Sequence, residues 1–232
     1  MLGIGVHTKA ARTNDASTLT TPGVATNIGS GLIVGMTWQG GVFTRLYDNY
    51  GNGEPLQIDL EFGSTQLYRF YYWPLLRKAG AGHTVTLDVN ATSYMTLVVL
   101  EVVTTNLQGI YLDQHNGGLD SASPFMDALS ITTLVRNALI VQAAFTTSFS
   151  SATDPDTYTP GGNWVMDENQ TTISTMIPGV IGHLPLADSV ALGTFTGNWT
   201  ALRDTAQTGF IGSFGEAPPM SPPSLFPLLV AA

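Results

Sequence analysis

The sequence predicts an all-β protein, an antiparallel β-sandwich with a jelly-roll-like arrangement, and three observations favour this class. Short runs rich in Val, Ile, Thr, Tyr and Phe alternate with Gly, Asn, Asp and Pro, which is the pattern of strands separated by turns. No stretch shows the apolar period of a convincing helix. The connections between the runs are short, whereas parallel strands need crossovers of about a dozen residues or more.

The chain divides into three segments by composition. We expect an N-terminal extension over residues 1–14, a sandwich domain over residues 15–215 and an extended Pro-rich, apolar arm over residues 216–232. A chain of 232 residues is long enough to build one large sandwich with a real core.

The first half of the domain contains the clearest strand patterns. Residues 31–38 predict a core strand, and Gly40 and Gly41 then lead into residues 42–47, which we interpret as the second strand of a hairpin. Residues 66–73 carry large groups on both faces, and residues 84–89 alternate as a half-buried strand. Residues 93–103 are apolar on both faces, which predicts a central strand covered by the opposite sheet and by a loop or a second layer.

The second half repeats part of this pattern. Residues 137–145 resemble residues 31–38, since each has a small residue, then Leu-Ile-Val, then a closing aromatic. We interpret this as a two-half organisation of the sandwich. Residues 146–162 predict a long loop, and residues 171–177, 190–196 and 207–214 predict further strands.

Charge and cysteine content exclude several kinds of partner. Charged residues make up 11% of the chain and the net charge is −9, with Lys9 and Lys78 as the only lysines. No basic cluster is present for nucleic acid or for an acidic membrane surface, so neither is expected as a partner. No apolar run reaches the roughly 18 residues of a membrane helix, and the N-terminus lacks a signal-peptide core. Without cysteine, stability must come from packing.

No catalytic, cofactor-binding or metal-binding motif is present, so we expect no enzyme activity. The four histidines, His7, His83, His115 and His183, lack ligand spacing. Glu101 ends an apolar strand, where an unpaired carboxylate is costly. A hydrolase would pair it with a second carboxylate such as Asp113 or Asp120. The favoured alternative is a structural carboxylate bonded to an arginine or to backbone amides.

Two further groups have competing interpretations. Asp48, Asn49, Asn52 and Glu54 carry hard oxygen ligands that suit calcium, but the same residues suit a tight turn. Trp164 and Trp199 each follow a Gly-Asn pair, which makes them candidate glycan-binding residues, although core packing is the commoner role of tryptophan in a sandwich.

The C-terminal arm contains five prolines after Glu216, which disfavour a sheet interior and favour an extended path. Such an end is commonly disordered, but this one is more hydrophobic than solvated tails are. We therefore expect it to bind a partner. The candidate partner-binding residues are Pro222, Pro223, Leu225, Phe226, Leu228, Leu229 and Val230.

The order of the strand and turn signals resembles a β-sandwich domain of tailed-phage and prophage structural proteins. The segments that carry the resemblance are GLIVGMTW (31–38), DNYGN (48–52), TVTL (84–87), SYMTLVVLE (93–101) and ALIV (138–141). It covers roughly residues 15–215 and leaves the arm outside.

The resemblance implies a non-enzymatic virion protein made in the host cytoplasm. The expected role is that of a capsid decoration or cement protein, a homo-oligomer that binds the major capsid protein or another virion protein through extended termini. The alternative is a carbohydrate- or receptor-binding module of a tail or fibre.

Overall fold

The computed structural model describes residues 2–12, 16–62, 67–120, 129–146, 158–170, 179–185, 192–197, 199–201 and 207–219. Within these ranges the chain contains strands and no helix, and the strands of its sheets pair antiparallel. The predicted all-β, antiparallel class is therefore confirmed. The strands are β1 (Leu2–Arg12), β2 (Thr18–Thr20), β3 (Gly31–Gln39), β4 (Phe43–Asp48), β5 (Leu56–Phe62), β6 (Leu67–Trp73), β7 (Val85–Val89), β8 (Tyr94–Thr104), β9 (Ile110–Asp120), β10 (Ser130–Thr132), β11 (Leu139–Thr146), β12 (Tyr158–Pro160), β13 (Val165–Gln170), β14 (Gly179–Leu184), β15 (Thr194–Thr196), β16 (Trp199–Ala201) and β17 (Gln207–Glu216).

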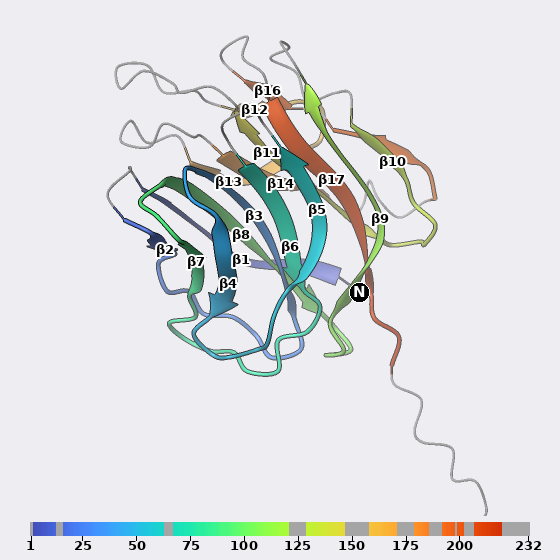
Figure 1. Ribbon diagram of the computed structural model, residues 1–232. Coiled ribbons are helices and arrows are strands. Elements are labelled where there is room, and N and C mark those ends of the chain that lie inside the picture. The colour runs from blue at the N-terminus through green and yellow to red at the C-terminus, as the bar shows by residue number, and fades with distance from the viewer. Residues whose placement is uncertain are drawn as a thin grey trace, which may run out of the picture.

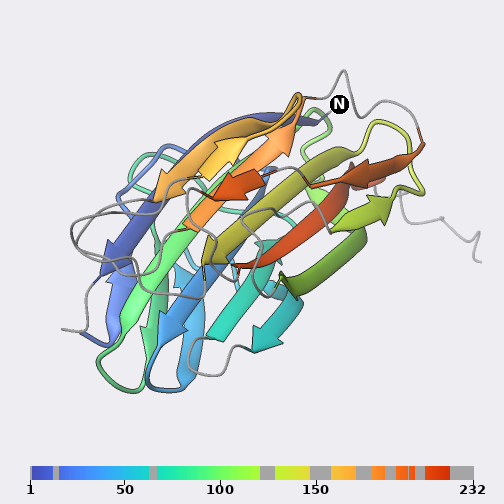
Figure 2. The same ribbon diagram turned by 90° about the horizontal axis from the view of Figure 1, so that it is seen from above.

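Two five-stranded sheets face each other in the middle of the molecule (Figures 1 and 2). The first has the order β1-β8-β3-β6-β5 and the second the order β13-β14-β11-β17-β9. The first sheet therefore comes entirely from residues 2–104 and the second from residues 110–216. The jelly-roll path is not confirmed, because its Greek keys would carry the chain back and forth between the two sheets. The two patterns that we compared, in β3 and β11, form the central strands of the two sheets.

The core between these sheets follows from the two-residue period of their strands. Alternate residues of β3, β6 and β8, such as Ile33, Phe70 and Leu100, point at the second sheet and are buried there. Phe145 and Phe210 face them from the second sheet, and the Phe70 and Phe210 rings stack with centroids 5.1 Å apart. Aromatic packing of this kind adds to the burial of apolar area.

The residues on the other side of the same strands are buried by additional layers. The three-stranded sheet β2-β7-β4 covers the outer face of the first sheet, where Met36, Trp38 and Leu97 pack against Leu87. The pairs β10-β15 and β12-β16 contribute to a third cluster on the outer face of the second sheet. This layering confirms the prediction that residues 93–103 form a strand covered on both faces.

Two features differ from the expectations. Residues 2–12, placed in an extension, form β1 and pair with β8 along most of their length. The predicted hairpin is also wrong, because β4 pairs with β7 and not with β3. Gly40 and Gly41 have φ values of 89° and 74°, and this left-handed turn redirects the chain into the covering sheet.

Three predicted segments lie wholly or partly outside the described residues. Residues 171–177 lie outside the described residues, and of residues 190–196 the structure describes a strand at Thr194–Thr196. The segment expected as a loop over residues 146–162 contains β12 within its described part.

Candidate functional site

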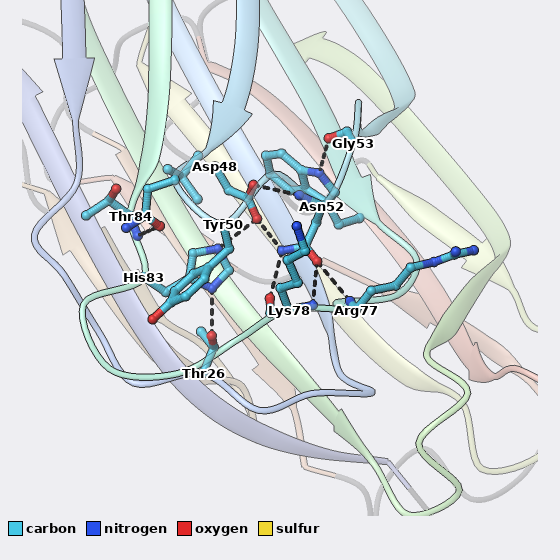
Figure 3. A network of polar contacts seen from close by, with 12 residues as sticks. Thr26, Asp48, Tyr50, Asn52, Gly53, Arg77, Lys78, His83 and Thr84 are labelled. Carbon is cyan, nitrogen blue, oxygen red and sulfur yellow. Dashed lines mark hydrogen bonds and ion pairs between the residues drawn. The ribbon is translucent and has the colours of Figure 1, made fainter.

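A buried chain of polar contacts joins three loops at one end of the first sheet (Figure 3). The Asp48 carboxylate at the end of β4 accepts a hydrogen bond from His83 Nε2 at 3.0 Å. The other ring nitrogen of His83, Nδ1, lies 2.6 Å from the Thr26 hydroxyl. The His83 side chain is buried, and the Tyr50 ring contacts its edge with centroids 5.1 Å apart. Thr26, Asp48 and His83 are distant in sequence, so no local motif predicts this network.

Asn52 extends the network into the next loop (Figure 3). Its side-chain amide donates to the Asp48 carboxylate and, at 2.8 Å, to the Lys78 carbonyl oxygen. Its Oδ1 accepts from the backbone amides of Arg77 and Lys78, each at 2.8 Å. The Trp73 indole donates to the Gly53 carbonyl oxygen at 2.8 Å. The turn over residues 48–53 is therefore held by hydrogen bonds within itself and by hydrogen bonds to residues 73–78.

These contacts favour the turn interpretation over calcium binding. The Asp48 oxygens already accept N–H donors from His83 and Asn52, and these donors occupy the lone pairs that a cation needs. Burial raises the pKa of the Asp48 carboxyl, but the hydrogen bonds from His83 and Asn52 outweigh it and hold that pKa below its usual value. Asp154 and Asp156, which flank Pro155 and also carry oxygen ligands that suit calcium, lie outside the described residues.

The hydroxyl, imidazole and carboxylate of this network are the groups of a catalytic triad, but the site has no room for a substrate. The adjoining cavity, lined in part by Thr26 and His83, measures about 10 Å³, which is about the space that a single water needs. The network therefore suits a structural role.

Glu101 is fully buried and has a structural explanation. A bulge in β1 places Gly5 and Val6 opposite this one residue of β8, which frees the Val6 amide from the ladder. Glu101 Oε2 accepts that amide at 3.1 Å, and Oε1 accepts the Asn27 amide and the Ser30 hydroxyl, each at 2.7 Å. A Cβ at Gly5 would collide with the carboxylate. The backbone-amide alternative is thus confirmed for this residue.

Neither carboxylate that we considered as a catalytic partner of Glu101 is seen to pair with it. Asp113 lies in β9 of the other sheet, where its carboxylate accepts the Ser213 hydroxyl at 2.9 Å and the Leu134 amide at 3.0 Å. The Asp120 side chain is outside the described part of the chain.

The remaining histidines lie apart from one another. His7 and Lys9 on β1 both contact the Glu168 carboxylate of β13, at 2.9 and 3.1 Å, which links the two main sheets at one edge. His183 contacts Asp167 at 2.8 Å. Across the described ranges, no three His, Asp or Glu side chains gather closely enough to hold a metal ion. In the same ranges, no helix is long and apolar enough to span a membrane.

The tryptophan pair does not form an exposed glycan platform. Trp164 is 7% exposed and packs in the outer cluster of the second sheet with Tyr158 and Val180. It therefore takes the core-packing role, and a sugar cannot stack on a ring so buried. The Trp199 side chain is outside the described part.

The root of the C-terminal arm is tied to the sandwich by the loop between β8 and β9. The Glu216 carboxylate accepts the Asn106 amide at 2.9 Å and the Thr105 hydroxyl at 3.0 Å. Asn106 Nδ2 donates to the Ala217 carbonyl oxygen at 2.6 Å, and the Ala217 amide donates to Gly109. The root of the arm therefore lies at the end of the second sheet where β9 begins and β17 ends (Figure 1).

The same loop displays an apolar side chain at a strained position. Leu107 is 60% exposed and has a φ of 57°, a left-handed conformation that costs about 1–2 kcal/mol for a residue other than glycine. Its backbone lies against Gly29, and the neighbouring Ile28 is also 60% exposed. The Leu107 side chain lies partly beside Gly29, and the rest of it faces solvent next to Ile28. The sequence does not identify Leu107 as a functional residue, because the segment shows only the pattern of a turn that ends at Gly109.

The seven candidate residues of the arm, from Pro222 to Val230, lie outside the described residues. Compared with known proteins, the chain matches no family model, no curated protein and no solved structure.

Proposed function

We propose that this chain is a non-enzymatic structural protein of a phage particle, a capsid decoration or cement protein that is anchored by its C-terminal arm. The observation that carries the proposal is the arm root, where Asn106 and Gly109 fix the start of the arm beside the exposed Leu107 and Ile28. A fixed root lowers the entropy that an arm loses on binding. Leu107 and Ile28 are exposed apolar side chains beside the root of the arm.

The layered sandwich supports a scaffolding role. Both faces of both main sheets are covered among the described residues, which leaves the outer layers, the strand edges and the loop ends for contacts with neighbours. The low charge content, 11% of residues, suits surfaces that are buried in an assembly, because desolvating charged groups is costly. We propose the major capsid protein or another virion protein as the partner and a homo-oligomer as the assembled form.

The polar clusters support a role without catalysis. The acids that the sequence singled out, Asp48, Glu101 and Asp113, each accept hydrogen bonds from the protein itself. Asp48 and Glu101 are also buried, and both features are typical of carboxylates that serve the fold. Because β1 belongs to the sheet, the anchoring role passes to the C-terminal arm alone.

The test is co-sedimentation with purified particles that lack the protein. A chain ending at Pro219 keeps the Glu216 and Ala217 contacts, so it should remain folded while losing particle binding. Leu107→Gly should weaken binding in the full chain. The matched control is Val42→Gly, because Val42 is 64% exposed and follows the C-terminal end of β3, whereas Ile28 precedes the N-terminal end. Undiminished binding by the shortened chain would refute the arm's role, and particles that bind none of the proteins would refute the virion assignment.

A further inference from the structure

A groove opens beside the covering sheet, far in sequence from the arm. It is lined by residues 43–46 of edge strand β4, by Glu54 and Pro55, and by the buried Tyr71. Its volume is about 170 Å³, below the range of roughly 300–1,000 Å³ that suits drug-sized ligands. The space therefore fits one small ring and its substituents.

An aromatic platform forms one wall of this groove. The Phe43 ring, which is partly exposed, stacks on Tyr71 with centroids 5.9 Å apart and an interplanar angle of 20°. The Arg69 guanidinium lies 4.5 Å from the Phe43 centroid and holds the ring by a cation–π contact. Arg69 Nη1 also donates to the Tyr71 hydroxyl at 3.2 Å, which fixes the guanidinium beside the ring.

The rim supplies hydrogen-bonding groups of both kinds. The Arg45 side chain is 62% exposed, and its orientation is set by Asp88 at 2.8 Å and by the Tyr47 ring at 4.2 Å. Glu54 is exposed and makes no hydrogen bond or ion pair within the described part of the chain. A guanidinium that donates and a carboxylate that accepts can together bind hydroxyl groups, each of which does both. Asp88 already balances the charge of Arg45, so Glu54 leaves the rim acidic, and an acidic rim disfavours an anionic ligand.

The strand edge itself disfavours a peptide as the occupant. The register of β4 on β7 shifts between Phe43 and Arg45, and a bulge with a charged residue on an edge strand blocks the addition of another strand. A compact ring does not need that edge.

We propose that this groove binds one pyranose ring of a neutral glycan, with the C–H face of the sugar on Phe43 and its hydroxyls on Arg45 and Glu54. This site goes beyond the anchoring role and does not depend on the arm. It also gives the glycan-binding alternative a different site, which lies at the covering sheet and does not involve Trp164 or Trp199.

The test is a microarray of neutral and sialylated glycans probed with the labelled full chain, followed by calorimetric titration of the best neutral glycan. Glu54→Gln should lower the affinity about tenfold, as expected for a lost charged hydrogen bond, and Phe43→Ala should lower it further. Glu54 is exposed and unpartnered among the described residues, so its variant should fold normally even if Phe43→Ala does not. Arg45→Gln should weaken binding, whereas the matched control Arg136→Gln, on the second half of the chain, should not.

Three results would overturn the proposal. They are the absence of binding to every neutral glycan, binding confined to sialylated glycans, and affinity unchanged by Glu54→Gln and Arg45→Gln together. Binding of an extended peptide that lacks sugar, without any glycan binding, would instead identify β4 as a strand-addition edge. Loss of glycan binding in these variants with particle binding intact would separate this site from the anchoring function.

Discussion

Replacing Glu101 tests whether its buried carboxylate holds the β1 bulge in place. In Glu101→Gln the shape is kept, but one oxygen becomes an amide nitrogen that donates. The glutamine amide has two orientations, and the less costly one places its nitrogen at the position of Oε2. In the parent protein Oε2 accepts the Val6 amide at 3.1 Å, so in the variant the Val6 N–H loses its acceptor. An unsatisfied buried donor costs about 1–3 kcal/mol. We therefore expect the free energy of unfolding to fall by about 1–3 kcal/mol, and by more for Glu101→Ala, which also removes the acceptor of the Asn27 amide.

Urea denaturation followed by tryptophan fluorescence measures this change, and hydrogen exchange locates it. The Val6 amide should exchange faster in Glu101→Gln, because its partner is the carboxylate and not the strand ladder. The same substitution at Glu54, which is exposed, should stay within about 0.5 kcal/mol of the parent. Equal stabilities for the two variants, or an unchanged Val6 exchange rate, would refute the bulge-capping explanation.

Three other predictions follow from the geometry. Asp48 has a lowered pKa in the folded protein, so the stability that its charged form contributes should be complete at neutral pH. That stability should be lost as the pH falls from about 5 through the folded pKa. Asp48→Asn should flatten this part of the profile of urea midpoint against pH, and an identical profile would contradict the prediction. Gly179→Ala would place a Cβ 2.5 Å from the Phe145 ring. This overpacking should lower the free energy of unfolding by about 1–3 kcal/mol and lower the melting temperature accordingly. An unchanged melting temperature would show that the ring moves freely. Leu107→Gly removes a left-handed leucine, and the relief should roughly offset the flexibility of glycine, so calorimetry should find stability within about 1 kcal/mol of the parent; a large destabilisation would mean that the leucine serves the fold.

The sequence predicts best those strands that are buried on both faces. Residues 31–38, 66–73 and 207–214 appear as β3, β6 and β17 almost within their predicted bounds. Their patterns are clear because both the opposite sheet and an outer layer require apolar side chains. The edge strands β1 and β9 carry polar residues such as His7 and Asn116, and an edge strand tolerates these residues, so its pattern resembles that of a loop.

Pairing and polar networks depend on contacts that sequence proximity does not reveal. The chain order suggested a hairpin of β3 with β4, but the glycines between them redirect β4 to a different layer. The sequence predicts an arginine or backbone amides as partners of Glu101, but it does not identify Val6, whose amide is one partner and lies 95 residues away. The arm root, where Asn106 contacts Ala217, has the same long-range character.

Electron cryo-microscopy of the assembled particle tests the central claim most directly. The proposed anchoring predicts density for residues 220–232 against another virion protein, with Leu107 and Ile28 buried at the same contact. A particle that contains the chain but leaves Leu107 in solvent, with the arm touching no neighbour, would contradict it.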